Sequence, residues 1–291
     1  MSIFQRVRYA SRRRCPPTLR PILQGVHRFR TFEVTHAVQS HGPAAQASVS
    51  LGFFQSTLGK KSVVAVTGAV LLGFLVGHVA GNLKIFLPDP EPGVSDIDVY
   101  AEFLRSMGEP MLPHGGALWT FRLILIVALV LHVVFVVQLS LVNRAVRPDR
   151  YERQHQVRGT FAAKWMMLSG VLVLGFVVFH LLHFTTGTID PANFEHGRVY
   201  ANVYAAFVRW PLVVLYAVAM GMVSLHLYHG AWSMFQTLGL DSPGRNRALR
   251  WFATIISVAL FVGFVVVPIS VAVGALDAPS ESVGQTETGG E

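Results

Sequence analysis

The sequence predicts an all-α membrane protein with five transmembrane helices, and three observations lead to this fold class. Of the 291 residues, 52% are hydrophobic and only 14% are charged, whereas soluble domains carry about a quarter charged residues. Five apolar runs each supply the roughly twenty residues that a bilayer-spanning helix needs. None of them has the polar face that a helix of a soluble bundle would show. The runs cover residues 63–87, 117–141, 165–186, 211–238 and 251–276.

The distribution of lysine and arginine predicts how the chain threads through the membrane. Three segments are basic (6–61, 142–164 and 245–250), whereas the connections 88–110 and 187–208 are acidic or poor in basic residues. Cytoplasmic loops carry an excess of lysine and arginine, so the three basic segments are expected on that side. The N-terminus is then cytoplasmic and the C-terminus outside. The net charge of +8 reflects this topology and not nucleic-acid binding.

Three regions follow from this pattern. Residues 1–52 are expected to form a basic cytoplasmic extension that is partly disordered, residues 53–276 the five-helix domain, and residues 277–291 an acidic polar tail. Two outer connections, 95–107 and 198–210, carry apolar residues at helical spacing. The first begins with a capping-box pattern from Ser95 to Asp98. Short helices on the outer surface are therefore expected, with plain solvated loops as the alternative.

Six of the twelve histidines lie inside the apolar runs, on four different predicted helices. They are His78, His132, His180, His183, His226 and His229. A single intramembrane histidine is equally well explained as a hydrogen-bonded packing residue. Proton relays combine histidine with buried carboxylates, and the five runs contain no Asp or Glu. Neutral imidazole is an axial ligand of haem iron, and two imidazoles hold an electron-transferring haem.

Depth within the membrane sorts four of these histidines into two pairs. With a rise of about 1.5 Å per residue, His78 and His180 lie roughly 20–24 Å from the cytoplasmic face, and we term them the outer pair. His132 and His226 lie roughly 14–18 Å from that face and form the inner pair. If each pair binds one haem, two haems are stacked across the membrane, and the predicted fold is a dihaem helix bundle.

A short internal repeat links the first and third runs. "TGAVLLGFLVGH" and "SGVLVLGFVVFH" place Gly68 before His78 as Gly170 is placed before His180. Ten residues are about 15 Å of helix, so these glycines are expected near the level of the inner pair. Glycine there would let a flat macrocycle approach the backbone, although ordinary helix packing also uses small residues. The repeat favours His180 over His183 as a ligand.

From residue 53 to the end of the fifth run the chain resembles the cytochrome b membrane-anchor subunit of succinate:quinone oxidoreductases and quinol:fumarate reductases. The form it resembles is the single-subunit, five-helix, two-haem type. The resemblance lies in "TGAVLLGFLVGHVAGNLKIF", the single histidine of the second run, "SGVLVLGFVVFHLLHF" and "HLYHGAWSMFQTLGL". In this family a histidine is followed four residues later by Gly, six by Trp and thirteen by Gly. Here that histidine is His226.

The resemblance implies that the outer pair holds a distal haem b and the inner pair a proximal one. It also implies a flavoprotein subunit and an iron–sulfur subunit on the cytoplasmic face, and a quinone, often menaquinone, as electron acceptor or donor. The expected location is a bacterial inner membrane. Some family members carry a glutamate two residues before the fourth ligand, where this chain has Ser224. A glutamate-based proton pathway is therefore not expected.

Further residues are candidates for contacts with a cofactor. His183 and His229 each lie three residues past a ligand, where they can bind a propionate, a quinone or a neighbouring helix. Cations near the membrane faces can pair with propionates or simply snorkel to the interface. Trp232 and Gln236 can line a cofactor edge, although interfacial belts also use tryptophan. The candidate cations are Lys84 and Arg122 on the outer side and Lys164 on the inner side.

Three alternatives remain open. Another dihaem cytochrome b, serving a nitrate reductase, hydrogenase or formate dehydrogenase, would also use four histidines on helices. A membrane transporter would have discontinuous helices or charges facing a cavity, and a structural anchor would bind no haem. The single cysteine, Cys15, excludes a cysteine-ligated iron–sulfur cluster within the chain. The chain also lacks a glycine-rich dinucleotide fingerprint, so we do not expect it to oxidise succinate without its partners.

Overall fold

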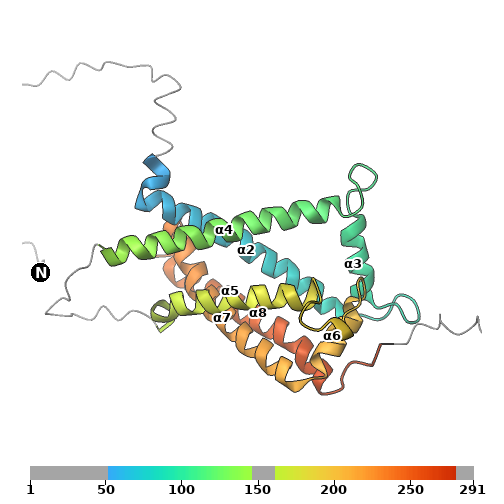
Figure 1. Cartoon of the computed structure of the whole chain (residues 1–291). Helices are drawn as coiled ribbons and strands as arrows, with labels where there is room; N and C mark the ends of the chain where they lie inside the picture. Colours follow the sequence, from blue (N-terminus) through green and yellow to red (C-terminus); the bar gives the residue numbers. More distant parts are fainter. Residues whose placement is uncertain (1–51, 146–160, 280–291) are drawn as a thin grey trace, which may run out of the picture. The chain divides into compact units, whose positions relative to one another are not determined.

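Five helices of the structure are long and apolar enough to cross a membrane. The structure is a computed structural model and describes residues 52–145 and 161–279, in which no β-strand occurs. The chain is thus an all-α, multi-pass membrane protein (Figure 1). The predicted N-terminal extension, most of the basic connection 142–164 and most of the acidic tail lie outside the described residues. The five helices are α2 (Thr57–Asn82), α4 (Gly116–Ala145), α5 (Phe161–Phe184), α7 (Trp210–Thr237) and α8 (Asn246–Ala272).

The helices extend beyond the apolar runs at several ends. α2 begins at Thr57 and not at residue 63, because Ser56 caps it by accepting a hydrogen bond from the Gly59 amide at 3.0 Å. α8 begins at Asn246 and not at residue 251. Polar and basic residues can therefore continue a membrane helix into the interface, where hydropathy no longer marks it.

α7 and α8 end in the same way, with a glycine in the left-handed conformation. Gly239 has φ +72° and Gly274 φ +74°. After α7 the Leu240 amide donates to the Phe235 carbonyl at 2.9 Å, and after α8 the Ala275 amide donates to Ser270 at 2.8 Å. These Schellman motifs satisfy the last carbonyl groups of each helix. α8 itself continues through Pro268, as membrane helices tolerate.

Helices α2 and α7 each contact several other long helices. α2 packs against α4, α7 and α8, and α7 packs against α5 and α8. α2 and α8 approach closely at Gly263, where an added Cβ would come within 2.6 Å of Val79 Cγ2. Large apolar side chains remain exposed on all five helices, among them Ile126 at 54% and Val171 at 60%. Such surfaces are expected of helices that face lipid.

Two short helices, α3 (Asp96–Ser106) and α6 (Val199–Phe207), lie in the connections where the sequence predicted them. The expected capping box, however, does not form. The Ser95 hydroxyl donates to Asp98 Oδ2 at 2.8 Å, while Asp98 Oδ1 accepts from the Val199 and Tyr200 amides at 2.5 and 3.1 Å. Asp98 therefore caps α6 instead of α3, because the fold brings a second helix N-terminus to the carboxylate. A 3-10 turn precedes each short helix, at Leu83–Phe86 and Pro191–Asn193.

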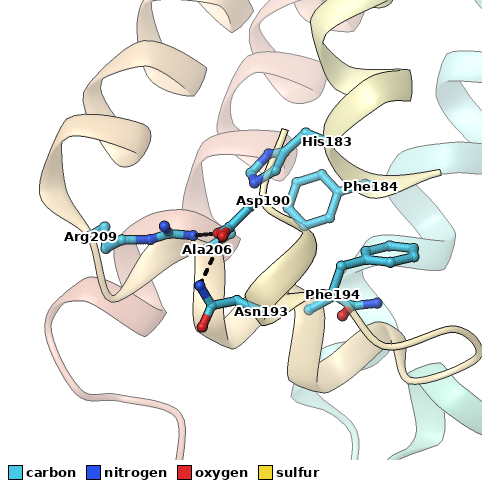
Figure 2. A pocket seen from close by; sticks show the side chains of 8 residues that line it. His183, Phe184, Asp190, Asn193, Phe194, Ala206 and Arg209 are labelled. Atoms are coloured by element: carbon cyan, nitrogen blue, oxygen red, sulfur yellow. Dashed lines mark hydrogen bonds and ion pairs between the residues drawn. The ribbon is translucent and has the colours of Figure 1, made fainter. Parts of the chain in front are cut away.

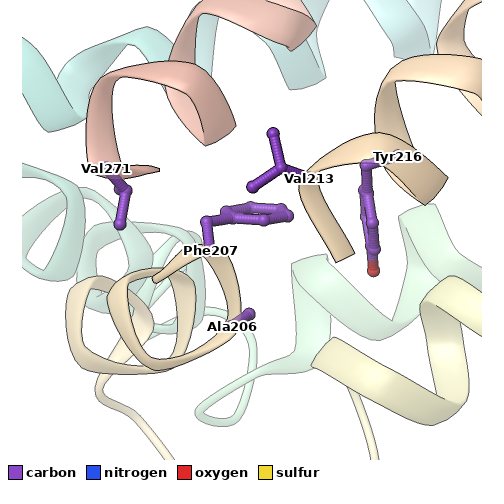
Figure 3. Packing of buried hydrophobic residues seen from close by; sticks show 5 residues of the cluster. All are labelled: Ala206, Phe207, Val213, Tyr216 and Val271. Carbon is purple, nitrogen blue, oxygen red and sulfur yellow. The ribbon is translucent and has the colours of Figure 1, made fainter. Parts of the chain in front are cut away.

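A hydrophobic cluster joins α6, α7 and α8 near the start of α7. Phe207 and Val213 pack against Val271, and the ring of Tyr216 completes the cluster (Figure 3). Phenylalanines of α5 cover it from the other side. Tyr216 is only 6% exposed, although its phenol hydroxyl needs a hydrogen-bond partner when buried. That partner belongs to the candidate site.

Candidate functional site

The outer pair comes together between α2 and α5. The imidazole ring centres of His78 and His180 are 5.9 Å apart, and the two ring planes are inclined by 83°. Phe74 and Phe176 lie one turn before each histidine, with ring centres 5.2 and 5.8 Å away. Phe264 of α8 approaches His78 to 5.7 Å. Two imidazoles thus face each other within an aromatic shell.

The spacing of the outer pair fits a bis-histidine haem. A metal–imidazole bond of about 2 Å on each side of one ion, together with about 1 Å from nitrogen to ring centre, puts two ring centres about 6 Å apart. The observed 5.9 Å agrees with this value. Among the described residues, no group of three or more His, Cys, Asp or Glu side chains could hold a metal ion by itself. A haem needs only two protein ligands, because its macrocycle supplies the other four.

Tyr216 connects the outer pair to His183. Its hydroxyl is 2.9 Å from His183 Nδ1 and 3.5 Å from His180 Nδ1. A hydroxyl has one proton to donate and lone pairs to accept, so it can donate to one imidazole and accept from the other. If the His180 Nδ1–H is the donor, its Nε2 keeps the lone pair that a metal ligand requires. His183 is only 4% exposed.

The inner pair is held by two hydroxyl groups in equivalent positions. Thr67 Oγ1 is 3.1 Å from His132 Nδ1, and Ser169 Oγ is 3.3 Å from His226 Nδ1. Each hydroxyl also donates its proton to a carbonyl of its own helix, at 2.7 Å for Thr67 and 3.0 Å for Ser169. It can therefore only accept from the imidazole, which places the proton on Nδ1 and leaves Nε2 free.

The two glycines of the sequence repeat lie against the inner pair. A Cβ added at Gly68 would come to 3.4 Å from His132 Cε1, and one added at Gly170 would come to 3.4 Å from His226 Cε1. This agrees with the level expected from helical rise. Each copy of the repeat therefore contributes to both pairs: its hydroxyl residue and glycine contact an inner histidine, and its own histidine belongs to the outer pair.

Other predicted residues lie apart from the two pairs. Lys84 Nζ is 2.9 Å from Asp96 Oδ2, so it joins the end of α2 to α3. Arg122 stacks on Trp119 of its own helix at 4.9 Å. Gln236 donates to Asp241 at 3.3 Å. Ser224 donates to the Ser257 carbonyl of α8 at 2.9 Å, so it joins α7 to α8. The Lys164 side chain lies outside the described residues.

A small pocket adjoins His183 at the end of α5 (Figure 2). Asp190 is its most constrained group, because it pairs with Arg209 and accepts from Asn193 Nδ2 at 2.8 Å. The hydrogen bonds from Asn193 and Arg209 hold the pKa of Asp190 below its ordinary value. Phe194, Asn202 and Ala206 complete the wall with Phe184. The sequence analysis singled out only His183 of these residues.

Three residues that orient the histidines had no predicted role. Thr67 and Ser169 stood in the quoted repeat only as shared hydroxyl residues, and Tyr216 was not singled out. The pattern that could have found them is a hydroxyl group inside an otherwise apolar run that also carries histidine. Searches against protein-family models, curated proteins and solved structures found no match for this chain.

Proposed function

We propose that this chain is the haem b-containing membrane-anchor subunit of a succinate:quinone oxidoreductase of the complex II type. Two observations support the proposal: the rings of His78 and His180 approach each other, and a hydroxyl group lies at Nδ1 of three of the four predicted ligands. A metal-ligating histidine characteristically donates the N–H of its other ring nitrogen to a neighbouring acceptor. The arrangement suits two haems b, one at each pair.

The chain's own residues set the properties of each site. A haem b at each pair would accept and pass on one electron. Thr67 and Ser169 orient the inner imidazoles, and their acceptor oxygens raise the basicity of these ligands. At the outer pair Phe74, Phe176 and Phe264 surround the imidazoles with apolar surface. Such a shell limits water access and lowers the local dielectric, which tunes a redox potential.

The partners and the quinone in this proposal come from the sequence resemblance. A flavoprotein and an iron–sulfur subunit would dock on the cytoplasmic face, and electrons would pass through the inner and then the outer site, or in reverse. The quinone would be menaquinone and the membrane a bacterial inner membrane. The continuous course of α8 through Pro268 favours this proposal over a transporter, whose site would interrupt its helices.

The test is a reduced-minus-oxidised spectrum of the purified complex with haem quantified per chain. Two b-type haems per chain are expected, together with two larger soluble partners that copurify. A chain without haem would contradict the proposal and indicate that the histidines are packing residues. Two haems with partners of a different enzyme class would assign the chain to another cytochrome b.

Replacing Tyr216 by phenylalanine is expected to raise the midpoint potential of the outer haem while both haems are retained. The substitution removes the oxygen that can accept from His180 Nδ1, so the ligand becomes less basic and favours the oxidised iron less. The expected shift is on the order of 59 mV, which for a one-electron couple is a tenfold change in the reduction equilibrium. Redox titration measures it, with Tyr228→Phe on the same helix as control. Equal titrations of the two variants would refute this role.

A further inference from the structure

Two buried nitrogen atoms at the C-terminal end of α7 have no hydrogen-bond partner in the part of the chain that the structure describes. They are Nδ1 of His229 and Nε1 of Trp232, and their ring centres are 6.3 Å apart. The great majority of buried polar groups in proteins are paired, and an unpaired one costs about 1–3 kcal/mol. The indole N–H can only donate. Two neighbouring unpaired nitrogens, one of them an obligate donor, therefore point to an acceptor that residues 52–145 and 161–279 do not supply.

Arg250 brings a positive charge to the same place. Its guanidinium carbon lies 4.0 Å from the centre of the Trp232 ring, and its Nε donates to Asn246 Oδ1 at 2.7 Å. Within residues 52–145 and 161–279, Arg250 forms no ion pair with an acidic side chain. Asp241, in the α7–α8 connection, accepts from Asn246 and Gln236 through Oδ2, while its Oδ1 is buried without a hydrogen-bond partner among the described residues. An anionic acceptor would satisfy both the donors and the charge.

The position of this cluster relates it to the inner pair. His226, His229 and Trp232 follow one another at intervals of three residues on α7, so each lies beside the next on the helix surface. Trp232 lies about 9 Å along the axis from His226, toward the α7–α8 connection. This distance is comparable with that from the centre of a porphyrin to the end of its propionate side chain.

We propose that His229, Trp232 and Arg250 form a carboxylate-binding site that holds a propionate of the inner haem. The inference rests on the proposed function, because it requires a haem at His132 and His226. A quinone carbonyl is the other acceptor that a membrane supplies, but it is neutral, whereas a carboxylate also attracts the Arg250 guanidinium. A carboxylate accepts several hydrogen bonds and pairs with guanidinium. The cluster then fixes the rotation of the macrocycle about the axis between the two ligands.

The experiment compares Arg250→Gln and Trp232→Phe with Arg247→Gln. Arg247 and Arg250 are both exposed at the same helix end, but Arg247 has no part in the site. Arg250→Gln is expected to lower the midpoint potential of the inner haem, because a cation near the propionate stabilises the reduced state. The expected change in the reduction equilibrium is about tenfold, which is about 59 mV for a one-electron couple. Trp232→Phe should act in the same direction by less. In both variants the resonance Raman propionate band should shift, while Arg247→Gln resembles the wild type.

The outcomes separate this inference from the proposed function. A wild-type complex without haem would overturn both. Two haems in the wild type, with titrations and propionate bands of Arg250→Gln and Trp232→Phe equal to those of Arg247→Gln, would overturn the carboxylate site alone. An unchanged propionate band with weakened quinone binding would also overturn it and assign the donors to a quinone. A His226→Leu complex that keeps one haem identifies the outer haem by its spectrum.

Discussion

Replacing His226 by leucine is expected to lower the haem content from two per chain to one. The Ser169 hydroxyl and the bare backbone of Gly170 hold the His226 imidazole, and no other described imidazole is held in this way opposite His132. Leucine fills a similar volume in an apolar span, so the helix should insert normally. Haem quantification per chain, with the spectrum of the remaining haem, measures the loss.

The matched control is His196→Gln. His196 lies outside the membrane spans, in the connection before α6, where its ring contacts Phe194 at 5.0 Å. This variant also removes an imidazole and should keep both haems. Two haems retained in the His226→Leu complex would contradict the assignment of the inner pair and indicate that His229, one turn further along α7, can replace it.

The five membrane helices could be predicted from the sequence because hydropathy over some twenty residues depends on composition alone. Their ends could not. The residues before the first apolar run include Lys60 and Lys61, which continue the helix without adding to its hydropathy. Asp98 shows a second limit: its spacing from Ser95 suits a capping box, but the carboxylate caps α6, about a hundred residues later. Only the tertiary fold determines which helix N-terminus the carboxylate meets.

The approach of His78 to His180 could be predicted for a similar reason, since depth in a membrane follows from helical rise and chain direction. The hydrogen bonds around them were not. Whether Tyr216 of α7 reaches His180 and His183 of α5 depends on how each helix is rotated about its axis. Ser169, His180 and His183 lie on one side of α5, but the sequence does not tell which neighbouring helix that side meets. Packing against α7 sets that rotation, and it turns His183 toward the tyrosine.

The two histidines of α5 provide a direct test of the outer pair. His180→Leu is expected to abolish the outer haem, because His180 is the α5 histidine whose ring faces His78 at 5.9 Å. His183→Leu is expected to retain both haems. Its imidazole is buried against Tyr216, so its loss leaves the tyrosine hydroxyl with His180 as its one described side-chain partner.

The expected cost of His183→Leu therefore appears in stability, at about 1–3 kcal/mol for a disrupted buried hydrogen bond, and not in haem content. Thermal unfolding of the complex and haem quantification measure the two effects separately. Loss of haem in His183→Leu but not in His180→Leu would show that the ligand is His183, one helical turn further along α5. That result would also break the equivalence between the two copies of the repeat, because His78 and His180 occupy corresponding positions in them and His183 does not.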